Sequence, residues 1–388
     1  MREEKYMAWQ TRNLMDLKRE FMELALQPGA NRRDLCRRFG ISPKAGYALL
    51  GRYREEGWAC LQPRSSRPHS SPLRSATSVE DAVVELRQQH PCWGGRKIAR
   101  VLANEGLASA PPPSTVTAIL HRHGLISPQA ALAATPWQRF EHDCPNALWQ
   151  IDFKGYFETL GGRCHPLTLL DDHSRFNLTL SACARPDTPS VQSHLQRVFE
   201  HYGLPVRINA DNGGPWGSPR AAQAHSLSDL SIWLIRLGIR VSHSAPYHPQ
   251  TNGKLERFHR SLKAEVLNGR SFSSLELAQQ AFDRWRSVYN HERPHDALGL
   301  QTPTQRYALS PRKFPLSLKP IEYSPDDTVI EVGWNGFIKF KGLRLHLSSS
   351  LHRLPIAMRP DRQNEGCYDA YFCHQQLMHL DMNTLGKP

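Results

Sequence analysis

The sequence predicts a multidomain fold: two all-α helix-turn-helix modules, then an α/β domain, then a small C-terminal β-barrel. Three observations predict this fold class. The chain has 388 residues, which suits two or three domains of ordinary size. Apolar residues recur at helical spacing in the first third of the chain and in alternating or β-branched runs afterwards. Proline- and alanine-containing segments divide the chain into 1–62, a linker 63–76, 77–126, a linker 127–146, 147–311 and 312–388.

The charge of the chain favours a polyanionic partner. Lys and Arg number 49 against 36 Asp and Glu, a formal net charge of +13, which is typical of nucleic-acid binding although ribosome-associated and membrane-surface proteins share it. No apolar run approaches the roughly 20 residues of a membrane span, and no secretory signal follows Met1, so we expect a cytoplasmic protein without a membrane partner. The eight cysteines form no C-x-x-C motif, and we interpret them as reduced thiols.

The first module has the pattern of a helix-turn-helix. We expect short helices at Arg32–Phe39 and Pro43–Glu55, with a turn at 40–42 between them. Ser42 is a suitable N-cap, and the proline after it fits the first helical position because its missing N–H costs nothing there.

The second helix of such a motif enters the major groove, so Lys44, Tyr47 and Arg52 are candidate DNA contacts. The net charge of residues 1–74 is +7, about half of the excess in a fifth of the chain. A solvated helical hairpin without DNA contacts is the alternative.

A second helical set follows at 77–126. Gly94–Lys97 opens its middle helix, and Ser114 is the expected cap of its last helix. A second helix-turn-helix here would let the protein read a longer DNA site than one module could. A purely structural three-helix bundle is the alternative.

The pattern then changes to that of a mixed α/β sheet. Three consecutive strands should form an antiparallel meander, and later strands alternate with helices. The expected elements are strands at 147–159, 164–170 and 176–183, a turn at 171–175, a helix at 188–202, a strand at 206–210, a helix at 227–237 and a strand at 239–242.

Three carboxylates in this region can meet in one pocket. Asp152 lies inside the first strand, Asp211 ends the fourth, and Glu256 lies near the start of a helix that runs to about Asn268. Without cations their mutual repulsion would raise their pKa values. Clustered carboxylates suit Mg²⁺ or Mn²⁺, and a pair of such ions supports cleavage or transfer of a phosphodiester.

Basic residues accompany Glu256. On its helix, His259, Arg260 and Lys263 follow at helical spacing, so that one stripe could track a phosphate backbone. Lys254 and Arg257 flank the acid, and we expect phosphate contacts from both, with solvated charges as the alternative.

Several blocks of this region resemble the signature blocks of bacterial insertion-sequence transposases with a retroviral-integrase-type catalytic core. These blocks are Trp149–Asp152, Ala210–Gly213, Tyr247–Arg260 and Tyr289–His295. The resemblance covers about residues 147–308. It implies an RNase H-like fold, Asp152, Asp211 and Glu256 as a DDE triad that binds two Mg²⁺ or Mn²⁺ ions, and cleavage at transposon ends followed by strand transfer into target DNA.

The resemblance also implies the partners of the protein. These are transposon-end and target DNA and further copies of the chain, since two ends must be brought together, in the bacterial cytoplasm on the nucleoid. In one departure from the family, 44 residues separate Asp211 from Glu256, a longer interval than usual, and we place the extra residues in a surface loop at 216–226. The zinc-binding His-His-Cys-Cys module of retroviral integrases is missing, so zinc is not expected.

Other polar residues of the region are further candidates for a catalytic or DNA-binding role. We expect Asp171 and Asp172 to serve the turn between two strands through side-chain-to-backbone hydrogen bonds, outside the triad. His243 and His248 fit a packed loop better than a catalytic or DNA-contacting role. A bracing role and a DNA contact stay open for the remaining two residues, Asn290 and Arg293.

The last segment alternates in the manner of β-strands. Apolar residues at Ile338 and Phe340, and again at Leu343 and Leu345, alternate with basic ones such as Lys339, which predicts a small β-barrel with a basic face. It resembles the C-terminal domain of integrase-like enzymes in strand pattern.

Two other functions remain open beside an active transposase. The chain could be a DNA-binding regulator or decayed transposase, in which the acids remain without turnover. It could also be a nuclease that hydrolyses DNA without joining it. The intact triad argues against decay, and the tandem helix-turn-helix modules argue against an unselective nuclease.

Overall fold

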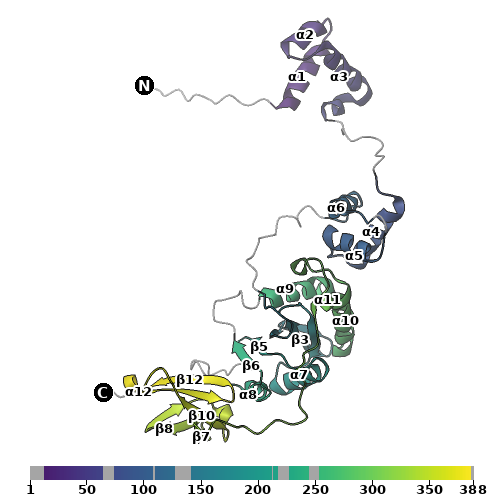
Figure 1. The fold of residues 1–388 in the computed structure, drawn as a ribbon. Coiled ribbons are helices and arrows are strands. Elements are labelled where there is room, and N and C mark those ends of the chain that lie inside the picture. Colours follow the sequence, from purple (N-terminus) through teal and green to yellow (C-terminus); the bar gives the residue numbers. More distant parts are fainter. Residues whose placement is uncertain are drawn as a thin grey trace, which may run out of the picture. The chain divides into compact units, whose positions relative to one another are not determined.

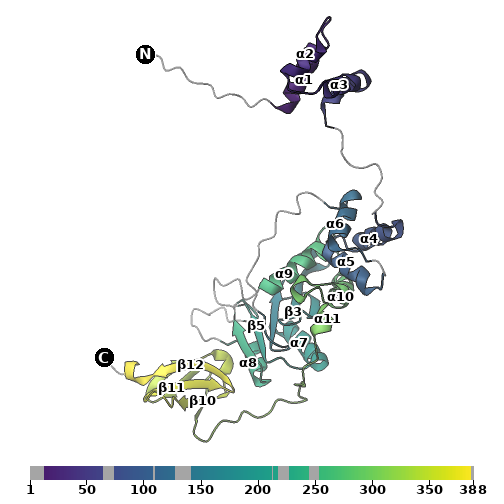
Figure 2. The same cartoon turned by 45° about the horizontal axis from the view of Figure 1, so that its top comes forward.

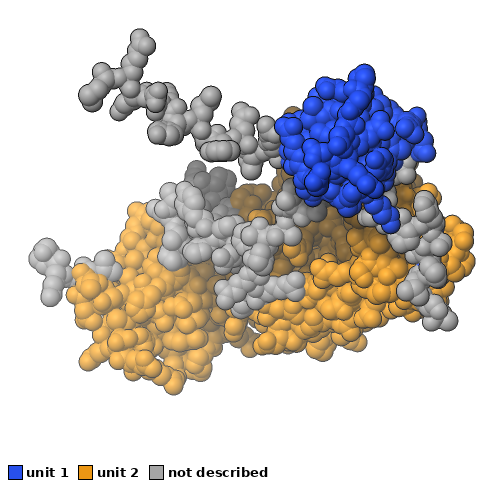
Figure 3. All heavy atoms as spheres, turned by 90° about the horizontal axis from the view of Figure 1, so that it is seen from above, with its two compact units in different colours: residues 1–74 blue, residues 75–388 orange. Residues whose placement is uncertain are grey.

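The computed structural model describes residues 13–63, 74–107, 110–126, 141–211, 213–216, 227–243 and 253–385. The chain divides into two compact units, residues 1–74 and 75–388 (Figure 3). The ribbons of Figures 1 and 2 show the helices and strands of each unit.

The first unit is a helical bundle that contains the predicted helix-turn-helix. Its helices are α1 (Leu14–Ala25), α2 (Arg32–Arg38) and α3 (Pro43–Glu56), followed by a 3₁₀ turn (Gly57–Leu61). The predicted N-cap of α3 is confirmed, because the Ser42 hydroxyl accepts a hydrogen bond from the Ala45 N–H at 3.2 Å. The helices pack closely at Gly46, where an added Cβ would lie 2.5 Å from the Cys36 sulfur.

The second unit begins with three further helices. They are α4 (Thr77–Gln89), α5 (Gly95–Asn104) and α6 (Pro113–Arg122), which pack around the buried side chains of Val83, Trp93, Ile98, Leu102, Val116, Ile119 and Leu120. The prediction that Ser114 caps α6 is wrong. The helix already begins at Pro113, and Pro112 is the cap residue without a side-chain hydrogen bond. Proline is favourable at this first position, and the helix start lies two residues upstream of the one that a cap at Ser114 would give.

A mixed β-sheet forms the centre of the second unit. Its main strands lie in the order β4–β3–β1–β5–β6, and the short β2 pairs with β3. The strands are β1 (Leu148–Phe153), β2 (Phe157–Thr159), β3 (Gly162–Asp171), β4 (Asn177–Cys183), β5 (Arg207–Ala210) and β6 (Arg240–His243). Pairs β1–β3 and β3–β4 are antiparallel, which confirms the predicted meander, whereas β1–β5 and β5–β6 are parallel.

Helices cover both faces of this sheet (Figures 1 and 2). Helices α7 (Thr188–Tyr202) and α8 (Asp229–Arg236) share one apolar core with it. Helices α9 (Gly253–Leu262) and α10 (Leu275–Ser287) share the other. Short helical segments extend or follow them at Lys263–Leu267, Val288–Glu292, Asp296–Leu298 and α11 (Pro303–Arg306). The strand order of this sheet and the helices on its two faces are those of an RNase H-like core.

The C-terminal segment forms two small open sheets. One has the order β12–β11–β10–β7, and the other is the hairpin β8–β9. The elements are β7 (Thr328–Glu331), β8 (Phe337–Phe340), β9 (Leu343–His346), a 3₁₀ turn (Ser349–Leu351), β10 (Pro355–Pro360), β11 (Cys367–Phe372), β12 (Gln375–Asp381) and α12 (Met382–Leu385).

The strands at residues 337–346 agree with the prediction, but the closed barrel is not confirmed. No strand pairing joins the two sheets within the described part of this segment. They instead share one apolar core, to which Ile232 and Ile235 of α8 also contribute. Because a neighbouring helix already helps to cover the apolar side chains, burial does not require the strands to close on themselves.

Candidate active site

Strand pairing brings Asp152 and Asp211 together. Strands β1 and β5 are parallel, with Gln150 opposite Asn209, so two residues further along Asp211 lies beside the strand position of Asp152. Neighbouring strands lie about 4.8 Å apart. Ile151 and Ala210 belong to the core on the α7 side, and since side chains alternate along a strand, both acids project from the opposite face, which α9 covers.

The electrostatics of Asp152 show the influence of both other acids. Burial, followed by the negative charge of Asp211, raises the pKa of Asp152 to about 7, and the charge of Glu256 raises it further by a smaller amount. The Phe153 N–H and the Lys154 ammonium act in the opposite direction. The three acids therefore interact electrostatically, and Asp211 interacts most strongly with Asp152.

The acids do not form a closed ligand cluster. Within the described residues, no three His, Cys, Asp or Glu side chains lie close enough together to hold a metal ion. Glu256 is exposed, whereas Asp152 and Asp211 are half-buried. The donor set itself, two carboxylates on one sheet face and a third on the helix that covers it, suits a hard divalent cation such as Mg²⁺ or Mn²⁺.

Helix α9 is held on the sheet by a buried polar contact that the sequence analysis missed. The His259 Nε2 lies 2.8 Å from the Thr168 hydroxyl on β3, and that hydroxyl donates to the Asp152 carbonyl oxygen at 2.9 Å. Thr168 faces Asp152 directly in the β1–β3 register. Burial, aided by the charge of Lys154, lowers the pKa of His259 to about 3, so its imidazole is neutral near pH 7. Apolar flanking residues on β3 gave no sign of this role for Thr168.

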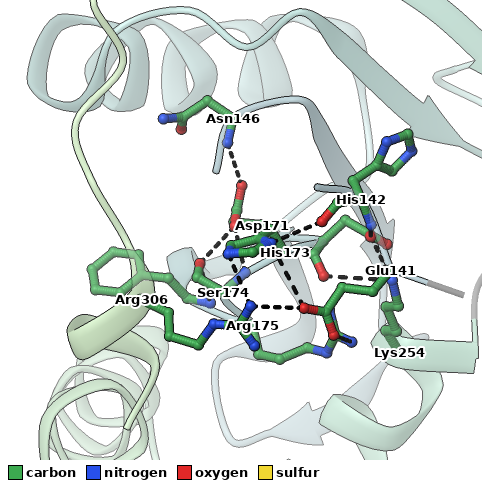
Figure 4. A network of polar contacts seen from close by, with 11 residues as sticks. Glu141, His142, Asn146, Asp171, His173, Ser174, Arg175, Lys254 and Arg306 are labelled. Atoms are coloured by element: carbon green, nitrogen blue, oxygen red, sulfur yellow. Dashed lines mark hydrogen bonds and ion pairs between the residues drawn. The ribbon is translucent and has the colours of Figure 1, made fainter. Parts of the chain in front are cut away.

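Asp171 organises the turn between β3 and β4, as predicted. Its carboxylate accepts hydrogen bonds from the Ser174 N–H at 2.8 Å, the Ser174 hydroxyl at 2.6 Å and the Asn146 N–H at 2.7 Å (Figure 4). Arg175, at the end of the same turn, forms an ion pair with Glu141 at 3.2 Å. This polar network fixes the loop next to the carboxyl end of β3.

Asp172 connects the same turn to α9. Its carboxylate accepts hydrogen bonds from the His142 N–H at 3.0 Å and the Gln150 side chain at 3.2 Å, and it forms an ion pair with the Lys254 ammonium. The Asp172 side chain is 2% exposed and that of Lys254 is 17% exposed. Lys254 precedes Glu256 by two residues, so this ion pair holds the first turn of the helix that carries the third acid.

Family models match the region that contains this site. Two models, both described as an integrase core domain, match residues 142–249 and residues 237–303. Residues 142–303 thus match the integrase core domain family, which supports the predicted membership of the DDE/retroviral-integrase superfamily. A helix-turn-helix domain model matches residues 17–69, and a homeodomain-like model matches residues 45–120.

Proteins encoded by insertion elements are among the similar sequences. An uncharacterised protein of insertion element IS407 from Burkholderia multivorans is 27% identical over 161 residues, 42% of this chain and 55% of that protein. An uncharacterised protein of insertion element IS476 from Xanthomonas euvesicatoria is 30% identical over 163 residues, 42% of this chain and 44% of that protein. The matches thus span about half the length of these relatives.

A solved structure of the HTLV-2 integrase catalytic core domain in complex with magnesium is also similar. It is 17% identical, with a TM-score of 0.32, over 43% of this chain and 99% of that chain. A TM-score this low adds nothing to the fold assignment, which rests on the sheet order and on the family models.

The basic residues near Glu256 differ in their exposure and in their contacts. Arg257, Arg260 and Lys263 are exposed on α9 and its continuation, where a phosphate backbone could reach them. Lys254 is occupied by Asp172. Because of its contacts with Asp172, Lys254 is less available for a phosphate contact than the three exposed cations.

In the first helix-turn-helix, Lys44 and Tyr47 are exposed on α3, and Tyr47 keeps 49% of its surface accessible. Arg52 instead donates to the Gln62 carbonyl at 3.1 Å and lies 3.6 Å from Glu56. The first two side chains are free to approach a groove, whereas Arg52 has a structural partner within its own unit.

The remaining polar candidates brace the integrase core. The Asn290 side chain accepts from the Asn177 N–H and donates to the Asn177 carbonyl, both at 2.9 Å, while Arg293 forms an ion pair with Glu265 at 2.9 Å. His243 Nδ1 lies 2.9 Å from the Asp211 carbonyl oxygen. Three sets of positions lie outside the described residues: His248, positions 217–226 of the loop predicted at 216–226, and positions 247–252 of the block Tyr247–Arg260.

Proposed function

We propose that the chain is a DDE transposase that binds the terminal inverted repeats of its element, cleaves the DNA there and joins the 3′-hydroxyl to target DNA. The observation that carries this proposal is the parallel register of β1 and β5, which sets Asp152 beside Asp211. Burial, followed by the negative charges of Asp211 and Glu256, raises the pKa of Asp152 to about 7. Three acids that interact in this way, on one face of an integrase core, are a site for cations and for phosphodiester chemistry.

Asp152, Asp211 and Glu256 would hold two Mg²⁺ or Mn²⁺ ions. Such ions, when bound, activate a water or a 3′-hydroxyl and stabilise the charge of the leaving oxygen. The protein's own residues would set the geometry: β1 and β5 place the two aspartates side by side, and α9 would present the glutamate to them. The half-buried position of Asp152 limits the access of water to one side of the site.

We propose two classes of DNA contact. Lys44 and Tyr47, with Arg52 at the far end of α3, would read the terminal repeat in the major groove. Arg257, Arg260 and Lys263 would hold phosphates beside the acids, with a smaller share from Lys254, whose charge already faces Asp172. The second helical set would extend the recognised site, and homo-multimers would bring two ends together.

This chemistry would take place on the nucleoid in the bacterial cytoplasm. Among the helices that the structure describes, none has both the length and the apolar composition of a membrane span.

The test uses purified full-length protein, labelled DNA from the ends that flank the gene, a target plasmid and Mg²⁺. Joined products support the proposal. Binding to end DNA without cleavage would indicate a regulator or a decayed transposase, and cleavage without joining would indicate a nuclease. In an active protein, Asp152→Asn and Glu256→Gln should abolish joining and leave end binding intact. An equal loss of binding would mean that these acids are structural.

A further inference from the structure

His259 lies on the inner face of α9, one turn after Glu256. Its side chain is buried, with 8% of the residue exposed, although α9 and its continuation carry three exposed cations. Residues three apart on a helix lie on the same face, so whatever fixes His259 also fixes the backbone that presents Glu256. Its partner, Thr168, is fully buried in the middle of β3.

The number of hydrogens determines the direction of this contact. The Thr168 hydroxyl has one hydrogen, and the Asp152 carbonyl oxygen, at 2.9 Å, can only accept. If that hydrogen points to Asp152, the hydroxyl must accept from the imidazole, so that Nε2 of His259 carries the hydrogen and donates over 2.8 Å. The ring is neutral near pH 7, since the pKa of His259 is about 3, and it therefore has one N–H to give.

The result is a continuous chain of contacts between two of the acids. It runs from the α9 turn of Glu256 through His259 Nε2 and the Thr168 hydroxyl to the main chain of Asp152. Hydrogen bonds are directional, so a shift of α9 along the sheet would break it. The apolar contacts of α9, such as those of Phe258, allow sliding more readily because they are not directional.

We propose that His259 is a positioning residue, which sets the placement of Glu256 relative to Asp152 through a hydrogen bond to Thr168. The inference rests on the proposed function, since it concerns the assembly of the same cation site. It adds to that function a residue outside the acidic triad. A misplacement of about 1 Å at a reacting centre can cost on the order of 100-fold in rate, which is why such a tether matters.

Matched variants separate positioning from packing. Thr168→Val keeps the shape but removes the hydroxyl, whereas Thr168→Ser keeps it. His259→Leu removes the donor, whereas the amide of His259→Gln can place an N–H near the position of Nε2. Each full-length variant is compared with wild type for joining rate, for end-DNA affinity and for Mn²⁺ affinity measured by water-proton relaxation without DNA.

Thr168→Val and His259→Leu should lower both the joining rate and the Mn²⁺ affinity by roughly 10- to 100-fold, as losses of residues that orient metal ligands do, with unchanged end-DNA affinity. Thr168→Ser and His259→Gln should keep most of both. If wild type joins DNA and Thr168→Val performs like Thr168→Ser, the inference is overturned while the proposed function stands. Parallel loss of end-DNA affinity would also overturn it, because the contact would then serve folding alone. If wild type neither joins DNA nor binds Mn²⁺, the proposed function fails and the inference with it.

Discussion

Lys254 forms an ion pair with Asp172, a residue with 1% exposure at the carboxyl end of β3. Because His259 makes its own contact with β3, two polar contacts from the sheet flank Glu256 on its helix. The third acid is thus carried by a helix that is anchored before and after it. The ion pair supplies stability, and the histidine contact supplies placement.

Replacing Asp172 tests the first of these contacts. Asp172→Ala leaves the Lys254 ammonium in a mostly buried position without its carboxylate, and the free energy of unfolding should fall by about 3–5 kcal/mol. Glu158→Ala is the matched control, since its ion pair with Arg163 is exposed, with side chains 64% and 59% accessible. It should cost less than about 1 kcal/mol. Similar losses of unfolding free energy for the two variants, measured in urea, would show that the ion pair of Asp172 and Lys254 is not buried in solution.

Two neighbouring positions on α3 should respond differently to alanine. Gly46→Ala places a methyl group 2.5 Å from the Cys36 sulfur and 3.1 Å from Phe21, so it should destabilise the first unit by about 1–3 kcal/mol. Lys44→Ala removes an exposed side chain and should leave stability unchanged while it weakens binding to end DNA. Thermal unfolding and fluorescence anisotropy measure the two effects. Wild-type affinity in Lys44→Ala would remove this helix surface from the DNA contacts.

The salt dependence of end binding reports the phosphate contacts of α9. Each of Arg257→Gln, Arg260→Gln and Lys263→Gln should reduce the slope of log affinity against log salt by about 1. Arg197→Gln is the control, because Arg197 is exposed on α7, which packs on the opposite sheet face. An unchanged slope in all three α9 variants would place the DNA elsewhere.

The pH dependence of stability tests the buried state of His259. Its pKa is about 3 in the folded protein against 6.5 for an ordinary histidine, so the unfolded chain binds the extra proton first as the pH falls. The contribution to stability is complete above pH 6.5 and is lost progressively below it. Between pH 6.5 and about 5, wild type should lose about 2 kcal/mol more than His259→Gln in urea unfolding. Equal losses would show that the folded protein accepts the proton freely.

Local signals account for the elements that the sequence predicted well. The start of α3 depends on Ser42 and Pro43, and the turn after β3 depends on the hydrogen bonds of Asp171, all of which involve near neighbours. One long strand was predicted at 147–159, but the structure has β1 and β2 with a break at Gly155, whose φ of +90° favours glycine and interrupts the extended backbone.

Contacts between distant residues account for what the sequence did not predict. The Thr168–His259 contact joins positions 91 residues apart, and neither residue type is unusual in its own segment. The predicted closed barrel of the C-terminal segment was not confirmed for the same reason, because α8 of the preceding domain fills part of the apolar core. The three acids could be found from their positions in the predicted strands and helix, but the common face of Asp152 and Asp211 required the parallel register of β1 and β5.

Mn²⁺ binding by the protein without DNA tests the central claim, that Asp152, Asp211 and Glu256 form one cation site. Water-proton relaxation should detect binding by wild type, and Asp152→Asn, Asp211→Asn and Glu256→Gln should each weaken it by roughly tenfold or more. Glu158→Gln, an exposed acid on β2, is the control and should bind as wild type does. Wild-type Mn²⁺ affinity in a folded Glu256→Gln variant would contradict the account, because the third acid would then lie outside the site.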